Sequence, residues 1–266
     1  MKAFDIVTLT VNPAVDKSTS FKGLVAEQKI RCEVPRYDAG GGGINVSKAI
    51  ARLGGNSMAL FTSGGAMGQL LEELVAKENI ASEAVAVESW TRESFVAVDT
   101  NTNSQYRFGF TGGSLTHEES ERFLAKITEF KPKFLVASGS LNEGLSIGNN
   151  RGTNNDALPK LNNDFSLFSL SEETRNTISK FPPLQSPFGT YNAAGDARIL
   201  FNQQIGATLT DMPLILFTSK NDYKAGIICG EGVWRWRIQE YAQTQSQAAS
   251  NEVLTKIIQY LSAKDD

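Results

Sequence analysis

The feature that most constrains the fold is a run of four glycines that leads directly into a helical pattern. Residues 39–55 read Ala-Gly-Gly-Gly-Gly-Ile-Asn-Val-Ser-Lys-Ala-Ile-Ala-Arg-Leu-Gly-Gly. Apolar residues recur there at helical spacing, and the two final glycines predict the end of the helix. Glycines without Cβ atoms allow a ligand close to the backbone, and the N–H groups of a first helical turn favour an anionic or hydroxyl-rich ligand. A flexible loop before an ordinary helix explains these residues equally well.

The composition narrows the possible partners and the compartment. A chain of 266 residues with 41% hydrophobic residues can form one large α/β domain or two smaller ones. A net charge of −3 argues against nucleic acid as a partner. No apolar run has membrane-spanning length, and no signal peptide is recognisable, so we expect a cytoplasmic protein without a membrane partner. Cys32 and Cys229 form no CxxC motif, and His117 is the only histidine, which argues against a multi-histidine metal site.

Residues 4–78 alternate between segments with a strand pattern and segments with a helix pattern. We expect a strand over residues 4–11, a helix after the glycines, a strand over 57–61 and a helix over 67–78. This alternation predicts a parallel, doubly wound α/β sheet. Pro13 should end the first strand, which would place Asp16 just past its carboxyl end, where such sheets bind ligands. A turn or capping role for Asp16 remains the alternative.

Antiparallel elements interrupt this alternation. Residues 95–99 and 105–110 predict a hairpin of the kind that forms a flap, or lid, over a site. Residues 20–37 predict a further strand outside the main alternation. Thr116 and Glu119 form a capping box, which places His117 on the surface of a helix's first turn. That helix should end at Pro132 and lead into a buried strand over 134–137.

Five pieces of the first half form an ordered set that covers residues 1 to about 145. They are Asn12-Pro13-Ala14-Val15-Asp16, the glycine-led segment 39–55, Trp90-Thr91-Arg92, Gln105-Tyr106-Arg107-Phe108 and Ser138-Gly139-Ser140-Leu141. In order and spacing they resemble the PfkB branch of the ribokinase superfamily of carbohydrate kinases, and within it the minor bacterial 6-phosphofructokinases. The resemblance implies a ribokinase-like sheet with a small β-lid, which agrees with the predicted flap.

The resemblance also implies roles for individual residues. Asp16 would hold sugar hydroxyls, and the sugar would lie against the glycine loop and near Ser140. Guanidinium groups suit the substrate phosphate because they bind its oxygens bidentately. The implied substrate-binding residues are Asp16, Lys29, Gly41, Gly42, Gly43, Asn45, Arg92, Arg107 and Ser140. Ordinary surface arginines are the alternative for Arg92 and Arg107. The family further implies a homodimer formed through the lid.

The second half departs from the family pattern. We expect a PfkB-like half over residues 1–147, an asparagine-rich linker over 148–164 and an atypical or truncated α/β segment over 165–266. Strand patterns occur at 212–217 and 225–230, and helices are expected after Ser171, around Trp234 and Trp236, and near the C-terminus. This segment faintly resembles the end of class I glutamine amidotransferase-like domains. It lacks a recognisable nucleophile, so Cys229 is interpreted as structural.

The catalytic part of the family pattern is hard to find. Phosphoryl transfer from Mg-ATP needs a base for the acceptor hydroxyl and positive potential on the transferred group. The family supplies both at a Gly-Ala-Gly-Asp helix start, and the nearest text here is Ala193-Ala194-Gly195-Asp196, before a possible helix over 197–204. Two functions stay open. One is a kinase that phosphorylates fructose 6-phosphate or a related sugar phosphate with Asp196 as its base. The other is a non-catalytic sugar-phosphate-binding or structural protein.

Overall fold

The computed structural model describes residues 4–138, 145–148, 153–193, 195–220 and 223–263. The chain divides into two compact units, at residues 1–141 and 142–266. Unit 1 contains a parallel sheet and a lid sheet with both parallel and antiparallel pairings, and unit 2 is built on a different, antiparallel sheet.

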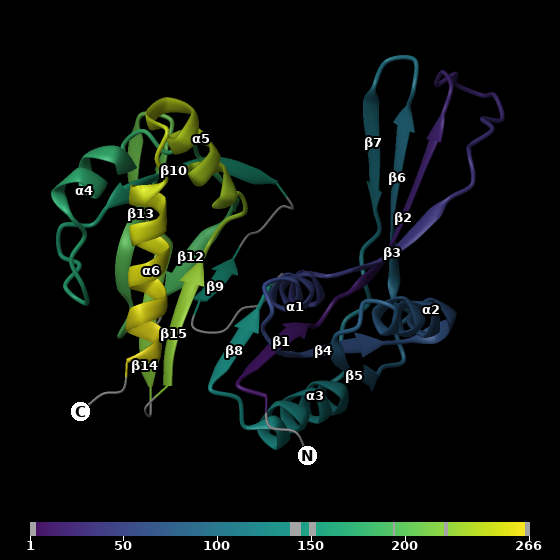
Figure 1. The fold of residues 1–266 in the computed structure, drawn as a ribbon, viewed down its shortest axis with the longest axis horizontal. Helices are drawn as coiled ribbons and strands as arrows, with labels where there is room; N and C mark the ends of the chain where they lie inside the picture. Colours follow the sequence, from purple (N-terminus) through teal and green to yellow (C-terminus); the bar gives the residue numbers. More distant parts are fainter. Residues whose placement is uncertain (1–3, 139–144, 149–152, 194, 221–222, 264–266) are drawn as a thin grey trace. The chain divides into compact units, whose positions relative to one another are not determined.

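The parallel sheet of unit 1 has the strand order β5-β4-β1-β8 (Figure 1). Its strands are β1 (Ile6–Thr10), β4 (Met58–Ser63), β5 (Ala81–Ala86) and β8 (Phe134–Ala137). Three helices accompany it, α1 (Gly42–Arg52), α2 (Gly65–Ala76) and α3 (His117–Phe130). The predicted alternation of strands and helices is therefore confirmed, and all the pairings in this sheet are parallel.

The two faces of the sheet are covered by different helices, as a doubly wound fold requires. Val7 and Leu9 of β1 pack in one apolar cluster with Phe123 of α3. The alternate residue Thr8 points to the other face, where its hydroxyl lies 2.8 Å from that of Ser47 on α1. The period of two along each strand thus separates the α3 layer from the α1 and α2 layer.

A second sheet in unit 1, which we call the lid sheet, has the order β3-β2-β6-β7 and extends away from the parallel sheet (Figure 1). Its strands are β2 (Ala14–Phe21), β3 (Arg36–Gly40), β6 (Arg92–Asp99) and β7 (Ser104–Gly109). The predicted hairpin is the β6–β7 pair. The strand expected over residues 20–37 is wrong in its centre, because β2 ends at Phe21 and residues 22–35 form the connection to β3.

Unit 2 contains a five-stranded antiparallel sheet and a separate two-stranded one. The larger sheet has the order β11-β10-β13-β14-β15, and β9 pairs with β12. The strands are β9 (Leu145–Gly148), β10 (Asn154–Leu161), β11 (Leu184–Pro187), β12 (Thr190–Ala193), β13 (Arg198–Ile205), β14 (Thr208–Lys220) and β15 (Tyr223–Ile228).

The helices of unit 2 close a core that is independent of unit 1. They are α4 (Glu172–Ile178), α5 (Trp234–Thr244) and α6 (Ala248–Ser262). Trp236 of α5 is fully buried, stacks on Phe181 at 4.8 Å between ring centroids, and donates from its indole nitrogen to the carbonyl of Pro182. Since this cluster draws its members from β10, β13, β14 and all three helices, unit 2 has a hydrophobic core of its own.

Two predictions for the second half are wrong. The linker expected over residues 148–164 contains β10, which pairs with β11 and β13. The helix expected over 197–204 is instead β13, whose residues Leu200 and Phe201 are both buried in the unit 2 core. The asparagine-rich composition of the first segment hid a strand that is half-buried through alternate residues. Among the described residues, no helix is long and apolar enough to cross a membrane.

Candidate functional site

The lid sheet has one polar face and one aromatic face, and its register decides which residues share a face. Asp16 of β2 is paired with Asp38 of β3 and with Ser94 of β6. Directly paired residues point to the same side of a sheet, and so do residues two apart on one strand. Arg92, two residues before Ser94, and Arg107, paired with Val96, therefore share this polar face with Asp16.

Asp16 lies inside β2, rather than just past a strand end as the sequence suggested. Partial burial raises the pKa of its carboxyl group, and Asp38 adds to this effect. A hydrogen bond from Ser94 and the charges of Arg92 and Lys48 act in the opposite direction. The guanidinium of Arg36 binds both oxygens of Asp38, at 2.7 and 2.8 Å, which limits the repulsion between the two aspartates.

The glycine segment fits closely between the lid and the parallel sheet. A Cβ atom on Gly40 would lie 2.5 Å from a carboxylate oxygen of Asp16, and one on Gly42 would lie 2.3 Å from the Ser138 hydroxyl. Gly41 has a φ of 136°, which side chains rarely allow. Thr10 accepts a hydrogen bond from the backbone N–H of Ile44, and Asn45 is exposed in the first turn of α1. Glycine is thus needed at 40 and 42 to keep Asp16 and Ser138 in place.

Gly43 has a different reason for being glycine. It is buried, and a Cβ there would lie 2.2 Å from the backbone oxygen of Leu9. Because backbone cannot move aside as a side chain does, we expect Gly43→Ala to lower the free energy of unfolding of unit 1 by about 2–3 kcal/mol. Urea unfolding would measure this, with Gly109→Ala as control because no atom lies within 4 Å of its Cβ position. Equal stabilities of the two variants would contradict the packing.

The arginines differ in exposure. Arg92 starts β6 and donates a long hydrogen bond of 3.5 Å to the carbonyl of Phe110, while its buried Nε atom has no partner in the described structure. Arg107 lies exposed on β7. Their positions differ by about four residues along β6, or roughly 13 Å, a separation that two long side chains on one face can bridge. Both arginines therefore belong to the polar face of the lid sheet.

Lys29 lies exposed in the connection between β2 and β3, outside the regular lid strands. That connection is tied down by buried Asp99, whose carboxylate accepts hydrogen bonds of 3.0 Å from the backbones of Gly23 and Asn101. These bonds lower the pKa of Asp99, so it stays ionised at neutral pH. Ser140 lies outside the described residues.

Asp196 belongs to unit 2. It lies exposed in the turn before β13, and its carboxylate accepts a hydrogen bond of 3.3 Å from the backbone of Ser219 on β14. A strand follows it instead of a helix, so the first turn of a helix, which would supply N–H groups to a phosphate, is missing at this place. Within the described ranges, no group of three or more His, Cys, Asp or Glu residues could hold a metal ion.

The two cysteines should differ in reactivity. Cys229 is buried, and burial raises its pKa to about 12, whereas Cys32 is exposed. Because the thiolate is the reactive form, we expect one thiol per folded chain to react with a disulfide reagent at pH 8, and two after denaturation. Cys32→Ser should abolish the reaction of the folded chain. Rapid reaction of two thiols in the folded chain would contradict the burial of Cys229.

Sequence reasoning missed three residues of the polar face, Arg36, Asp38 and Ser94. Their signal was the alternation of polar residues along two short strands. The alternation alone does not place these three residues beside Asp16. Their position follows only from the strand register, in which β2 pairs with both β3 and β6.

Comparisons with known proteins find relatives for the first half of the chain. The model of the family described as pfkB family carbohydrate kinase matches residues 2–154. ATP-dependent 6-phosphofructokinase isozyme 2 of Mycobacterium tuberculosis is 43% identical over 143 residues, which are 53% of this chain and 42% of that protein. The Escherichia coli enzyme of the same name is 38% identical over 53% of this chain and 46% of its own length. The chain thus spans less than half of these relatives.

This chain is also similar to a solved structure over part of its length. The crystal structure of phosphofructokinase-2 from Escherichia coli in complex with fructose-6-phosphate has a TM-score of 0.49 and 39% sequence identity. The similarity covers 53% of this chain and 47% of that one.

Proposed function

Because this chain belongs to the pfkB family of carbohydrate kinases, whose model matches residues 2–154, we propose that unit 1 binds a sugar phosphate, with fructose 6-phosphate as the first candidate. One observation carries the proposal: the register places Asp16, Arg92 and Arg107 on one face of the lid sheet. The glycine segment lies directly beside that face, because the space for a Gly40 side chain is filled by the Asp16 carboxylate.

Each group has a chemical role in this proposal. The carboxylate of Asp16 accepts hydrogen bonds from sugar hydroxyls, and Gly41, Gly42, Gly43 and Asn45 form the edge against which the sugar ring lies. Arg92, Arg107 and Lys29 neutralise the phosphate, the two arginines through forked N–H donors. Ser140 is assigned to the sugar side by resemblance alone.

The described residues of the second half do not fit the Mg-ATP that a kinase would use. Asp196 precedes a strand, so there is no helix start at that point to hold transferring phosphate groups, and no candidate metal cluster is present among the described residues. These observations favour the second candidate function, sugar-phosphate binding without catalysis, over an active kinase.

Calorimetric titration tests the binding proposal. Fructose 6-phosphate should bind with a stoichiometry of one, and fructose, which lacks the phosphate, should bind much more weakly because it cannot use the arginines. No heat of binding for fructose 6-phosphate at millimolar concentration would refute the proposal.

A coupled assay of ADP release separates the two candidate functions. We expect no release above background from the wild-type chain with fructose 6-phosphate and Mg-ATP, and the same for Asp196→Asn. Turnover that is lost in Asp196→Asn would establish an active kinase with Asp196 as base. Equal turnover in both proteins would establish an enzyme with a different base.

The aromatic face of the lid sheet is the proposed contact of a homodimer. Phe95 and Phe108 stack there at 5.8 Å, and Lys17 lies 5.5 Å from the ring centroid of Tyr37. The Phe108 side chain is 51% exposed in the single chain. Exposed aromatic surface of this kind favours association. Analytical ultracentrifugation should show a dimer that Phe108→Lys shifts towards monomer, while an unchanged mass would count against a lid contact.

A further inference from the structure

The lid sheet is joined to the rest of unit 1 partly through two segments that meet at α3. We call residues 87–91, between β5 and β6, the incoming connection, and residues 110–116, between β7 and α3, the outgoing connection. Arg92 follows the incoming connection directly. The geometry of these two connections therefore sets where β6 and β7, with their arginines, enter and leave the lid.

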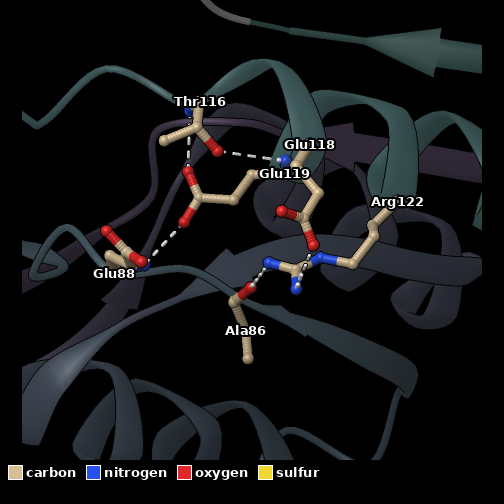
Figure 2. A network of polar contacts seen from close by, with 6 residues as sticks. All are labelled: Ala86, Glu88, Thr116, Glu118, Glu119 and Arg122. Atoms are coloured by element: carbon tan, nitrogen blue, oxygen red, sulfur yellow. Dashed lines mark hydrogen bonds and ion pairs between the residues drawn. The ribbon is translucent and has the colours of Figure 1, made fainter.

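Glu119 bonds to both connections at once (Figure 2). One carboxylate oxygen accepts a hydrogen bond of 2.6 Å from the backbone N–H of Glu88 in the incoming connection. The other accepts one of 2.7 Å from the backbone N–H of Thr116 in the outgoing connection. The residue is only 3% exposed. A capping box needs the second bond alone, so the first is an additional function of this side chain.

Further contacts hold the same two segments together. Arg122, one turn along α3, donates a hydrogen bond of 3.2 Å to the carbonyl of Ala86, the last residue of β5 before the incoming connection (Figure 2). A Cβ atom on Gly113 would lie 2.3 Å from the Ser89 side chain, so the connections touch directly. Thr91, the last residue of the incoming connection, forms two hydrogen bonds with Gly64. Its backbone N–H donates to the Gly64 carbonyl at 2.9 Å, and its hydroxyl accepts from the Gly64 N–H at 3.1 Å.

We propose that Glu119 is a positioning residue of the sugar-phosphate site, which joins the incoming and outgoing connections of the lid and thereby holds Arg92 and Arg107 in place. The ligand part of this inference rests on the proposed function. The amides of Thr116 and Glu88 lower the pKa of Glu119 below the usual value of a glutamate. The carboxylate is therefore ionised at neutral pH, and the link is lost only as the pH falls through that lowered pKa.

Hydrogen exchange of the ligand-free chain tests the link itself. In Glu119→Gln the neutral side-chain amide keeps only one acceptor oxygen. At least one of the two hydrogen bonds is therefore lost, and the other is no longer charge-assisted. We expect exchange of the incoming connection and of β6 and β7 to become about tenfold faster or more, the ratio expected for the loss of one such bond. Exchange in α1 and β4 should stay unchanged.

Thr116→Ala is the matched control. It removes the hydroxyl that accepts from the Glu119 backbone at 3.2 Å, and so weakens the helix cap, but it leaves both bonds of the Glu119 carboxylate in place. Its faster exchange should be confined to the first turn of α3. If Glu119→Gln changes only that turn as well, Glu119 is merely a capping residue and the inference is overturned. Should Glu119→Gln fail to fold, Glu119→Asp should give the same pattern more weakly because the shorter side chain cannot reach both amides, and unchanged exchange in β6 and β7 would overturn the inference.

Titration with fructose 6-phosphate gives the functional readout. Glu119→Gln should weaken binding about tenfold, whereas Thr116→Ala should bind like the wild type. Equal affinity of Glu119→Gln and the wild type would overturn the positioning role. If the wild type itself does not bind this sugar phosphate, the proposed function fails, and the exchange data still decide whether Glu119 joins the two connections.

Discussion

Replacing both Arg92 and Arg107 by glutamine is expected to weaken fructose 6-phosphate binding by about 100-fold or more. Each guanidinium offers charge-assisted hydrogen bonds to the phosphate, and each such bond contributes about 1.5–3 kcal/mol. The residues share the polar face of the lid sheet, so no other described cation of that face except Arg36 could replace them. The guanidinium of Arg36 is already bound to both carboxylate oxygens of Asp38.

Calorimetry with two ligands makes this prediction specific. The weak binding of fructose should be unchanged in the double variant, because the arginines act on the phosphate. Lys133→Gln is a suitable control, since Lys133 is an exposed cation paired with Asp5 at 3.1 Å. If the double variant binds fructose 6-phosphate as the wild type does, the phosphate does not lie on this face.

Trp236→Ala is expected to lower the free energy of unfolding of unit 2 by about 3–5 kcal/mol, as for other buried aromatic residues. The side chain is fully buried between Phe181 and Phe201, and its indole N–H is bonded to the carbonyl of Pro182. A loss of this size is a large part of the total stability of a domain. Unit 1 has its own cores, so its binding of sugar phosphate should persist.

Calorimetric unfolding of three proteins would check this. Trp234→Ala is the matched control, because Trp234 lies on the same helix with 57% of its surface exposed, and it should unfold like the wild type. In Trp236→Ala, unit 2 should unfold at a lower temperature than in the wild type. Binding of fructose 6-phosphate should persist after this transition. Loss of binding together with that transition would show that the sugar-phosphate site needs unit 2.

The first half was predictable because its patterns are local. Helix α3 begins at the predicted Thr116–Glu119 capping box, and β6 and β7 form the predicted hairpin. The position of Asp16 was misjudged because β1 ends at Thr10 and a new strand begins directly after Pro13. Propensity cannot tell a turn residue from the third residue of a strand when tertiary pairing with β3 and β6 decides the matter.

The second half was harder because its elements depend on distant partners. Strand β13 pairs with β10, which lies far earlier in the chain, as well as with β14, which follows it after the two-residue turn at Gly206 and Ala207. Asparagine-rich residues 154–155 likewise become strand only when β11 supplies the hydrogen bonds. The bond from Glu119 to Glu88 joins residues 31 positions apart, so the capping box predicted one of its two hydrogen bonds and gave no sign of the other.

The most direct test of the central claim is a residue-resolved amide NMR titration of the intact chain with fructose 6-phosphate. We expect the largest shift changes at Gly42, Ser94 and Arg107, which lie on three separate segments around Asp16, and none in the core of unit 2. Inorganic phosphate should shift the signals of Arg92 and Arg107 but leave Gly42 unchanged. Shift changes centred on unit 2, or none at millimolar ligand, would contradict a sugar-phosphate site on the polar face of the lid sheet.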